Sequence, residues 1–314
     1  MAPLTAGHEI SAEFECFGST CAVHVAGHGS LGSAGDAVAE AERRLRRWHQ
    51  QFSRFDRDSE LARLNSDPRR TVPVSPMMAR FVESVSAVGS LTGGLVDGTL
   101  VSEIEQAGYA AQFEANPIPL AVALALAPPR RAARPSRSAR WRELSDDHAA
   151  GTVTRPPGLR LDSGGIAKGL FTDELSLVLA EYRSFAVDCG GDIRLGGAER
   201  LIREIKVASP FEERILTTLE ASDGAIATSG IGKRSWRGPY GSTAHHLIDP
   251  GTGKPAFTGI VQVTALAPTG VMAEALSKAA LLAGPQAADR WLTRGGVIVY
   301  DDGAHRTIPP VSGS

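Results

Sequence analysis

The sequence predicts an α+β fold, and two patterns support this prediction. Helical spacing of apolar residues dominates the first third of the chain, and short segments rich in valine, isoleucine and threonine follow later. In doubly wound proteins strands and helices alternate regularly, and this sequence shows no such alternation. With 314 residues, of which 42% are hydrophobic and 22% charged, the chain has the composition of a globular protein and not of a wholly disordered one.

Two helices are expected in the first third. Val38, Ala41 and Leu45 recur at intervals of three and four residues, which predicts one buried helical face over residues 33–52. The pair Ser75-Pro76 is typical of a helix start, and paired glycines end this second helix. Further helices are expected over residues 166–182, 271–283 and 285–293, and strands over residues 20–26, 159–162, 184–188, 204–208, 215–219, 260–266 and 297–300.

The segment 127–142 stands apart because it holds six arginines and no acidic residue. We expect a solvated loop, since the interleaved aromatic residues of a single-strand nucleic-acid binder are missing. One domain is expected over residues 11–308, with this loop inside it. A disordered N-terminus over residues 1–10 and a tail over residues 309–314 complete the expected organisation.

Charge and cysteine content limit the partners and the compartment. The 33 basic and 35 acidic side chains give a formal charge of -2, so bulk electrostatics draw the chain neither to nucleic acid nor to an anionic membrane. The three cysteines, an odd number, form no CxxC pair, and no secretory signal or membrane-spanning pattern is recognisable. We therefore expect a cytoplasmic protein.

Glycine-rich turns at predicted strand ends are the first candidate functional features. At residues 162–169, a strand runs through paired glycines into a helix start, which offers free N–H groups to an anion, and Lys168 adds a positive charge. A similar glycine pair follows Cys189. Residues 227–234 suggest a phosphate-binding P-loop, but Ala227 replaces the first glycine and Arg234 replaces the metal-binding hydroxyl. A P-loop NTPase is therefore excluded.

Two further clusters contain titratable side chains. His245 and His246 are adjacent on a predicted strand, so at most one of them points into a site; a satisfied strand histidine is the alternative. Glu274 and Lys278 are four residues apart on a predicted helix and share a face. Taken alone, such a pair is most often an exposed ion pair of little consequence.

The order of these elements resembles that of the FAD:protein FMN transferases, the ApbE-like flavin transferase family. The resemblance covers residues 14–302, nearly the whole chain. Its matching elements are Phe17-Gly18-Ser19-Thr20, residues 52–56 with 59–61 and 64–65, residues 96–100 around Asp97, residues 162–169 with Asp173, Gly190-Gly191-Asp192, Thr228-Ser229-Gly230 and residues 246–250. The resemblance implies an ApbE-like fold of mixed sheets with packed helices.

The resemblance also implies a reaction. Such an enzyme binds FAD, splits its pyrophosphate, transfers FMN to a serine or threonine hydroxyl of a target protein and releases AMP. Helix-start N–H groups and nearby cations suit the two negative charges of a pyrophosphate. His246 is the implied general base or the residue that positions the hydroxyl, although His245 and Asp249 stay open as bases. The implied FAD-binding residues are Phe17, Gly18, Ser19, Asp97, Asp162, Gly165, Lys168, Asp173, Gly191, Asp192, Thr228, Ser229, Arg234 and His246.

The sequence departs from the family at the metal-binding positions. The family binds Mg²⁺ with an aspartate and a threonine of one helix and with a carbonyl near the glycine turn. Here these positions are Glu274, Lys278 and the carbonyl of Ala167. Mg²⁺ prefers oxygen ligands, which an ammonium cannot supply. Either Lys278 occupies the metal's place and acts in catalysis, or it turns to solvent and the metal site is merely degraded.

These departures leave three functions open. The first is FMN transfer to another protein, with FAD as substrate. The second is a flavoprotein that holds FAD intact and has lost the transfer chemistry. The third is hydrolysis of FAD to FMN and AMP, with water as the acceptor. The expected partners are FAD and a target protein with an acceptor serine or threonine, and neither nucleic acid nor a membrane.

Overall fold

A computed structural model describes residues 9–110, 118–238 and 241–311, and its centre is one eight-stranded sheet. All neighbouring strands of this sheet pair antiparallel, which confirms the α+β prediction. The strand order is β1 (Ile10–Cys16), β2 (Ser19–Ala26), β8 (Ser184–Cys189), β9 (Asp192–Gly196), β12 (Gly224–Gly230), β17 (Ile260–Ala267), β18 (Gly296–Tyr300) and β19 (His305–Ile308).

Short ribbons and helices surround the sheet. The smaller strands are β3 (His28–Gly29), β4 (Gly32–Ser33), β5 (Thr71–Pro73), β6 (Ser145–Asp147), β7 (Thr152–Thr154), β10 (Arg203–Ala208), β11 (Ile215–Ala221), β13 (Ser235–Arg237), β14 (Thr243–His245), β15 (Ile248–Asp249) and β16 (Lys254–Pro255). The α-helices are α1 (Ala34–Gln51), α2 (Glu60–Ser66), α3 (Pro76–Leu91), α4 (Val101–Gln106), α5 (Leu120–Ala125), α6 (Ala167–Leu179) and α7 (Gly270–Ala283). Short 3₁₀ turns are η1 (Arg140–Glu143), η2 (Ser163–Gly165) and η4 (Asp289–Trp291).

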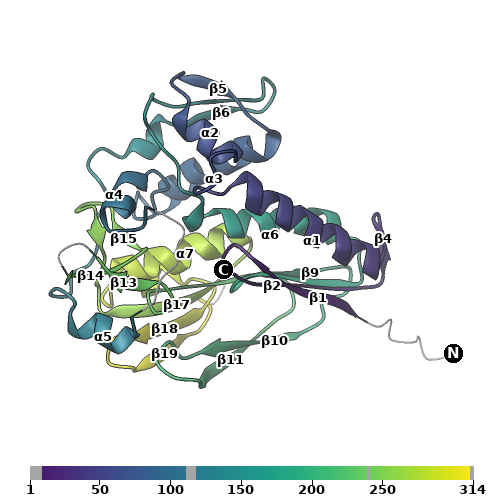
Figure 1. Ribbon diagram of the computed structural model, residues 1–314. Coiled ribbons are helices and arrows are strands. Elements are labelled where there is room, and N and C mark those ends of the chain that lie inside the picture. Colours follow the sequence, from purple (N-terminus) through teal and green to yellow (C-terminus); the bar gives the residue numbers. More distant parts are fainter. Residues whose placement is uncertain (1–8, 111–117, 239–240, 312–314) are drawn as a thin grey trace.

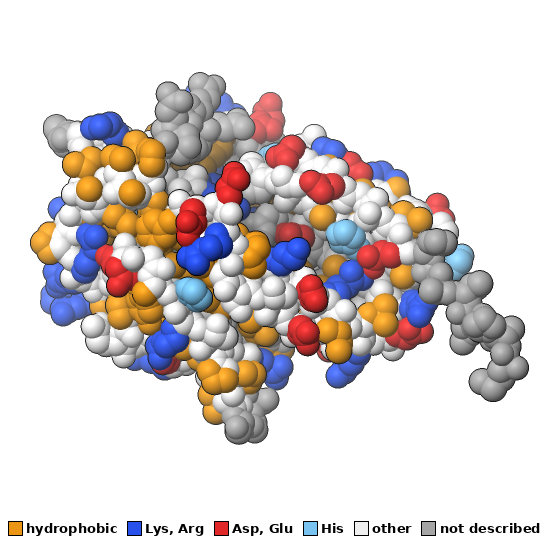
Figure 2. Space-filling view, turned by 90° about the horizontal axis from the view of Figure 1, so that it is seen from below, with side chains coloured by type: hydrophobic (Ala, Val, Ile, Leu, Met, Phe, Trp, Pro, Cys, Tyr) orange, Lys and Arg blue, Asp and Glu red, His pale blue; other side chains and the backbone are white. Residues whose placement is uncertain are grey.

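The helices α1, α6 and α7 cover one face of the sheet, and the ribbon β10–β11 lies below the opposite face (Figure 1). Seen from that opposite side, acidic and basic side chains are interspersed and hydrophobic ones gather in several places (Figure 2). Ile202 and Ile215 of the ribbon region are among the exposed hydrophobic residues. The buried core lies on the helical side, where aromatic rings such as Trp48 and Phe171 stack between α1 and α6.

Helices α6 and α7 cross in direct backbone contact. A Cβ atom on Gly169 would lie 2.5 Å from the carbonyl oxygen of Gly270, and one on Gly270 would lie 2.4 Å from that of Gly169. Only glycine permits this approach. The crossing brings the N-terminal turns of both helices together beneath the glycine-rich segment that precedes α6.

Most predicted elements form, and two of the exceptions depend on contacts with other parts of the chain. The strand expected over 159–162 is wrong, because Leu161 hydrogen bonds to the side chain of Asn65 at both its N–H and its carbonyl. The helix expected over 285–293 reduces to η4. Strands β1, β9, β12 and β19 were not expected. Strand β12 has no element expected over it, yet its neighbours β9 and β17 pair with it on both sides.

The expected boundaries and the arginine-rich loop have structural counterparts. Ile10, expected in the N-terminal segment, begins β1, whereas residues 1–8 and 312–314 of the expected tails lie outside the described residues. In the segment 127–142 all six arginines are exposed, but Arg131 and Ala133 donate backbone hydrogen bonds to Phe257 and Leu282. The loop is thus solvated and tied to the domain. Across the described ranges, no helix has both the length and the hydrophobicity that crossing a bilayer requires.

Candidate active site

A cavity of about 340 Å³ opens between the start of α6, the second half of α7 and the helical part of the chain. This volume falls within the range of small-molecule sites, about 300–1,000 Å³. One part of its wall is aromatic and aliphatic, and the other part is charged. The apolar lining consists of Phe17, Phe52, Phe55, Leu95, Val96, Leu100, Ile104, Tyr109, Phe171, Leu247, Ile248 and Leu282.

The glycine turn before α6 forms one edge of the cavity, and two distant segments hold it in place. Asn65 hydrogen bonds to both backbone groups of Leu161, at 2.7 and 2.9 Å. Ser163 Oγ donates to the carbonyl of Phe52 at 2.9 Å. These contacts explain why residues 52–56 and 64–65 accompany the glycine turn in the sequence. They leave the backbone of residues 163–165 facing the cavity.

Asp162 directly precedes the glycine turn, and the guanidinium of Arg54 balances its negative charge. Arg54 Nε lies 3.4 Å from Asp162 Oδ1, and an Arg54 Nη donates to the carbonyl of Tyr109 at 2.9 Å. Nearby, Asp97 accepts hydrogen bonds from both the N–H and the hydroxyl of Thr99. Burial nevertheless raises the pKa of Asp97 above its usual value.

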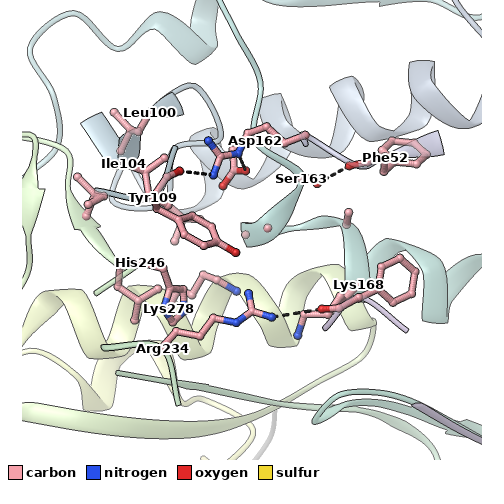
Figure 3. Close-up of a pocket in the computed structure, with 18 of the residues that line it drawn as sticks. Phe52, Leu100, Ile104, Tyr109, Asp162, Ser163, Lys168, Arg234, His246 and Lys278 are labelled. Carbon is pink, nitrogen blue, oxygen red and sulfur yellow. Dashed lines mark hydrogen bonds and ion pairs between the residues drawn. The ribbon is translucent and has the colours of Figure 1, made fainter. Parts of the chain in front are cut away.

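Three cations line the opposite side of the cavity. Lys168 comes from the first turn of α6, Lys278 from α7, and Arg234 from the segment before β13. Figure 3 shows Arg234, His246 and Lys278 facing Asp162 and Tyr109 across the cavity. Arg234 Nη2 also donates to the carbonyl of Phe17 at 3.2 Å, which fixes its guanidinium beside the chain turn at Phe17-Gly18.

Both lysines are paired with buried carboxylates. Lys168 Nζ lies 2.5 Å from Asp192 Oδ2, and Lys278 Nζ lies 2.8 Å from Glu274 Oε1. Asp192 and Glu274 are 1% and 0% exposed. Burial raises the pKa of Asp192 to about 6 despite the charge of Lys168. For Glu274, burial acts in the same direction, but Lys278 and Lys168 outweigh it and lower its pKa. Glu274 is therefore ionised at neutral pH.

The two adjacent histidines point in different directions. His245 packs edge-on against Phe257 in the core, and its Nδ1 accepts the N–H of Leu247. His246 lines the cavity, and its buried Nδ1 makes no hydrogen bond. Burial, followed by the charge of Arg234, holds the pKa of His246 well below its usual value. The imidazole that faces the cavity is therefore neutral at pH 7.

The residues at the implied metal position do not fit a divalent cation. Glu274 Oε2 accepts the N–H of Gly169 at 2.9 Å and Oε1 accepts Lys278, so both oxygens already have donors. Lys278 is 8% exposed, and its ammonium donates to Glu274 at 2.8 Å and so does not turn to solvent. Among the described residues, the metal-ligating side chains that do cluster are the surface group Glu83, Asp146 and His148.

The structure brings together ten of the residues expected to form the site. Those lining the cavity are Phe17, Gly18, Asp97, Asp162, Gly165, Ala167, Lys168, Arg234, His246 and Lys278. Asp192 and Glu274 are one hydrogen bond further away, through the two lysines.

Five other expected residues have neighbours elsewhere. Ser19 packs against the turn at Gly190-Gly191, Thr228 pairs with Thr264 at 2.9 Å, and Ser229 pairs with Ser277 at 2.7 Å. Asp173 accepts the N–H groups of Gly270 and Val271 at the start of α7. None of Ser19, Asp173, Gly191, Thr228 and Ser229 is among the residues that line the cavity, and their contacts with FAD stay predictions.

The sequence and the fold of this chain were compared with those of known proteins. The sequence pattern of the ApbE family matches residues 17–300. The chain belongs to the ApbE family. The FAD:protein FMN transferase of Escherichia coli K12 is 26% identical over 261 residues, which cover 80% of this chain and 72% of that protein. That of Vibrio cholerae is 28% identical over 265 residues, which cover 79% and 73%.

Solved structures agree with the family assignment. The ApbE protein of Thermotoga maritima superposes with a TM-score of 0.77 at 23% identity and covers 96% of this ApbE chain and 97% of its own. The flavin transferase ApbE of Vibrio cholerae gives a TM-score of 0.71 at 22% identity, over 97% and 98%. The expected ApbE-like fold is thus confirmed.

Sequence reasoning missed part of the cavity wall. Arg54 and Phe55 were noted only as part of a family motif, and Tyr109 and Phe171 were not noted at all. The signal available for Arg54 was its place between Phe52 and Phe55 in that motif. The ring of Tyr109 stacks on Trp236 and meets Phe55 edge-on, contacts between distant segments that no local pattern signals.

Proposed function

We propose that this ApbE family protein is an FAD:protein FMN transferase, as its relatives are named. The observation that carries the proposal is a set of three cations, Lys168, Arg234 and Lys278, that share one cavity with a neutral histidine. A pyrophosphate offers two negative charges to such cations, and the glycine turn offers backbone N–H groups beside them. The aromatic and aliphatic residues that line the same cavity suit the flavin or adenine rings.

In the proposed reaction, a serine or threonine hydroxyl of the target protein attacks the phosphorus of the FMN half. A new P–O bond forms at this phosphorus, and the bond from the same phosphorus to the bridging oxygen breaks, so that AMP leaves with the bridging oxygen and the electron pair of that bond. His246 takes the hydroxyl proton, because its imidazole is unprotonated before the reaction. Lys168, Lys278 and Arg234 stabilise the charge that builds up on the phosphate oxygens.

The remaining site residues position these groups. Asp192 and Glu274 hold the two ammonium groups, and Phe17, Gly18, Asp97, Asp162 and Gly165 shape the FAD pocket. The resemblance to the family implies Mg²⁺ as well, with Ala167 and Glu274 as ligands. Because these residues do not fit a divalent cation, the proposed reaction contains no metal step. A cytoplasmic location stays a prediction.

The test measures what becomes of the AMP half and of the FMN half of FAD. Purified protein is incubated with FAD and an extract that contains candidate target proteins; AMP is quantified, and covalent flavin is detected by fluorescence after denaturing electrophoresis. We expect AMP and protein-bound FMN in equal amounts, and their loss in His246→Ala with FAD binding nearly unchanged. AMP with free FMN would instead indicate a hydrolase. Intact FAD recovered from yellow protein, without AMP, would indicate a flavoprotein.

A further inference from the structure

Four buried or half-buried charges form a closed cluster behind the cavity. Lys168 and Lys278 supply two positive charges, and Asp192 and Glu274 supply two negative ones. They come from α6, β9 and α7, so the helix crossing and the sheet together bring them into contact. The cluster neutralises itself without an added ion, and this is unusual for a site where the family pattern places a metal.

Besides pairing with Lys278, Glu274 caps the start of helix α6, and this second contact fixes its position. Helix α6 has no side-chain cap of its own, and Glu274 Oε2 accepts the N–H of Gly169 in its first turn. A carboxylate is favourable at a helix N-terminus because of the helix dipole. The carboxylate is thereby held between the N–H of Gly169 and the ammonium of Lys278. To bind Mg²⁺, Glu274 would have to give up the ammonium, which would then be left buried and unpaired beside a divalent cation.

The ammonium of Lys278 lies where it can reach a phosphate. The side chain lines the cavity and passes under the glycine turn, since a Cβ atom on Gly165 would lie 3.9 Å from Lys278 Cε. Lys168 and Arg234 line the same cavity. Asp192 and Glu274 balance the two lysines, and Arg234 adds a further positive charge to the same cavity. A pyrophosphate in the cavity therefore meets hydrogen-bond donors and positive charge supplied by side chains.

We propose that the Lys278 ammonium, held by Glu274, takes the electrostatic place of a divalent cation, so that this chain binds FAD and transfers FMN without metal. The part that concerns transfer rests on the proposed function, whereas the part that concerns FAD binding does not. Lys278 contacts the substrate phosphate and is a catalytic residue. Glu274 acts through Lys278 and through the start of α6 and is a positioning residue.

The experiment measures FAD affinity with and without metal in two matched double variants. Glu274→Asp with Lys278→Thr restores oxygen ligands at the implied metal position. Glu204→Asp with Lys206→Thr makes the same two changes on the exposed ribbon β10 and serves as the control. The dissociation constant of FAD is obtained from flavin fluorescence, once in millimolar Mg²⁺ and once in EDTA, after circular dichroism has established that each variant is folded.

For the wild type and the control variant we expect the two dissociation constants to agree within twofold. For the Glu274→Asp, Lys278→Thr variant we expect at least tenfold weaker binding in EDTA, partly restored by Mg²⁺. A wild-type affinity that falls tenfold or more in EDTA would overturn the inference, and so would a folded double variant that binds FAD as the wild type does in EDTA. If the double variant does not fold, the wild-type comparison still decides.

Failure of the proposed function gives a different result. The same proteins are then incubated with FAD and the extract that contains candidate target proteins, in Mg²⁺ and in EDTA, and AMP and protein-bound FMN are both measured. Absence of AMP in every condition, together with metal-independent FAD binding, would contradict the transferase and support the ammonium's role in binding. Metal-dependent FAD binding, with metal-dependent release of AMP and formation of protein-bound FMN, would support the transferase and contradict the role of Lys278.

Discussion

The N-terminal turns of α6 and α7 are built alike but surrounded differently. Asp173 of α6 accepts the N–H groups at the start of α7, and Glu274 of α7 accepts the N–H of Gly169 at the start of α6. The two helices thus cap each other. Asp173 faces Arg194 at 3.4 Å outside the cavity, whereas Glu274 faces the cavity's lysines. Both capping carboxylates therefore have a cationic partner, but only the partner of Glu274 lines the cavity.

The largest effect on the free energy of unfolding is expected when Glu274 is removed. In Glu274→Ala, helix α6 loses its cap and the ammonium of Lys278 loses its buried partner. Removing one partner of a buried ion pair costs about 3–5 kcal/mol of the free energy of unfolding. Urea unfolding monitored by circular dichroism measures this loss. A loss below about 1 kcal/mol would mean that water or another group already satisfies Lys278.

The next largest effect is expected from a substitution at the crossing of α6 and α7. In Gly169→Ala the new methyl group would lie 2.5 Å from the carbonyl oxygen of Gly270, so the helices have to separate. Overpacking of this kind costs up to about 3 kcal/mol. Gly35→Ala in α1 is the control, because its new Cβ has no neighbour closer than 3.7 Å. Equal unfolding midpoints for the two variants would contradict the backbone contact.

His245 is buried and uncharged in the folded chain, in contrast to the two lysines, which are charged and paired with carboxylates. Burial lowers the pKa of His245 to about 3, so the folded chain stays unprotonated there while the unfolded chain takes up a proton near pH 6.5. The free energy of unfolding therefore falls as the pH drops from 6.5 towards 3, by about 1.4 kcal/mol per pH unit.

Comparing wild type with His245→Asn isolates this group, since an amide oxygen can accept the N–H of Leu247 in place of Nδ1. Between pH 7 and pH 5 we expect the wild type to lose about 2 kcal/mol more than the variant. Urea titrations at the two pH values measure the difference. Parallel losses in both proteins would show that His245 titrates normally in the folded state.

The smallest expected effect is at the Asp173 end. Asp173→Ala removes one cap from α7, but Thr269 still caps that helix through its own side chain. We expect a loss of about 1 kcal/mol in the free energy of unfolding and an FAD affinity within twofold of the wild type. A tenfold loss of FAD affinity would restore Asp173 to the binding residues that the family resemblance implies.

Sequence patterns predicted the fold class and the main helices because local spacing carries that information. The helix over 33–52 is visible in Val38, Ala41 and Leu45, which are buried against the sheet. Strand β12 was missed because its small polar residues become a central strand only through pairing with β9 and β17. The division between Asp173 and Glu274 was equally invisible, since it depends on which side of the helix crossing each carboxylate lies.

The site was predicted best where a motif and a charge coincide. Lys168 and Lys278 were identified because one follows a glycine turn and the other replaces an expected metal ligand. The sequence left open whether Lys278 faces solvent or the site, and the structure buries it against Glu274. The aromatic wall around Tyr109 was not predicted, because its rings come from segments more than 50 residues apart.

The central claim is that side-chain cations, and no divalent metal, serve this FMN transferase. Its most direct test is the single-turnover rate of AMP release from FAD in the presence of an acceptor protein, measured in EDTA and in millimolar Mg²⁺. We predict rates that agree within twofold. A rate that falls more than tenfold in EDTA and recovers on addition of Mg²⁺ would contradict the account.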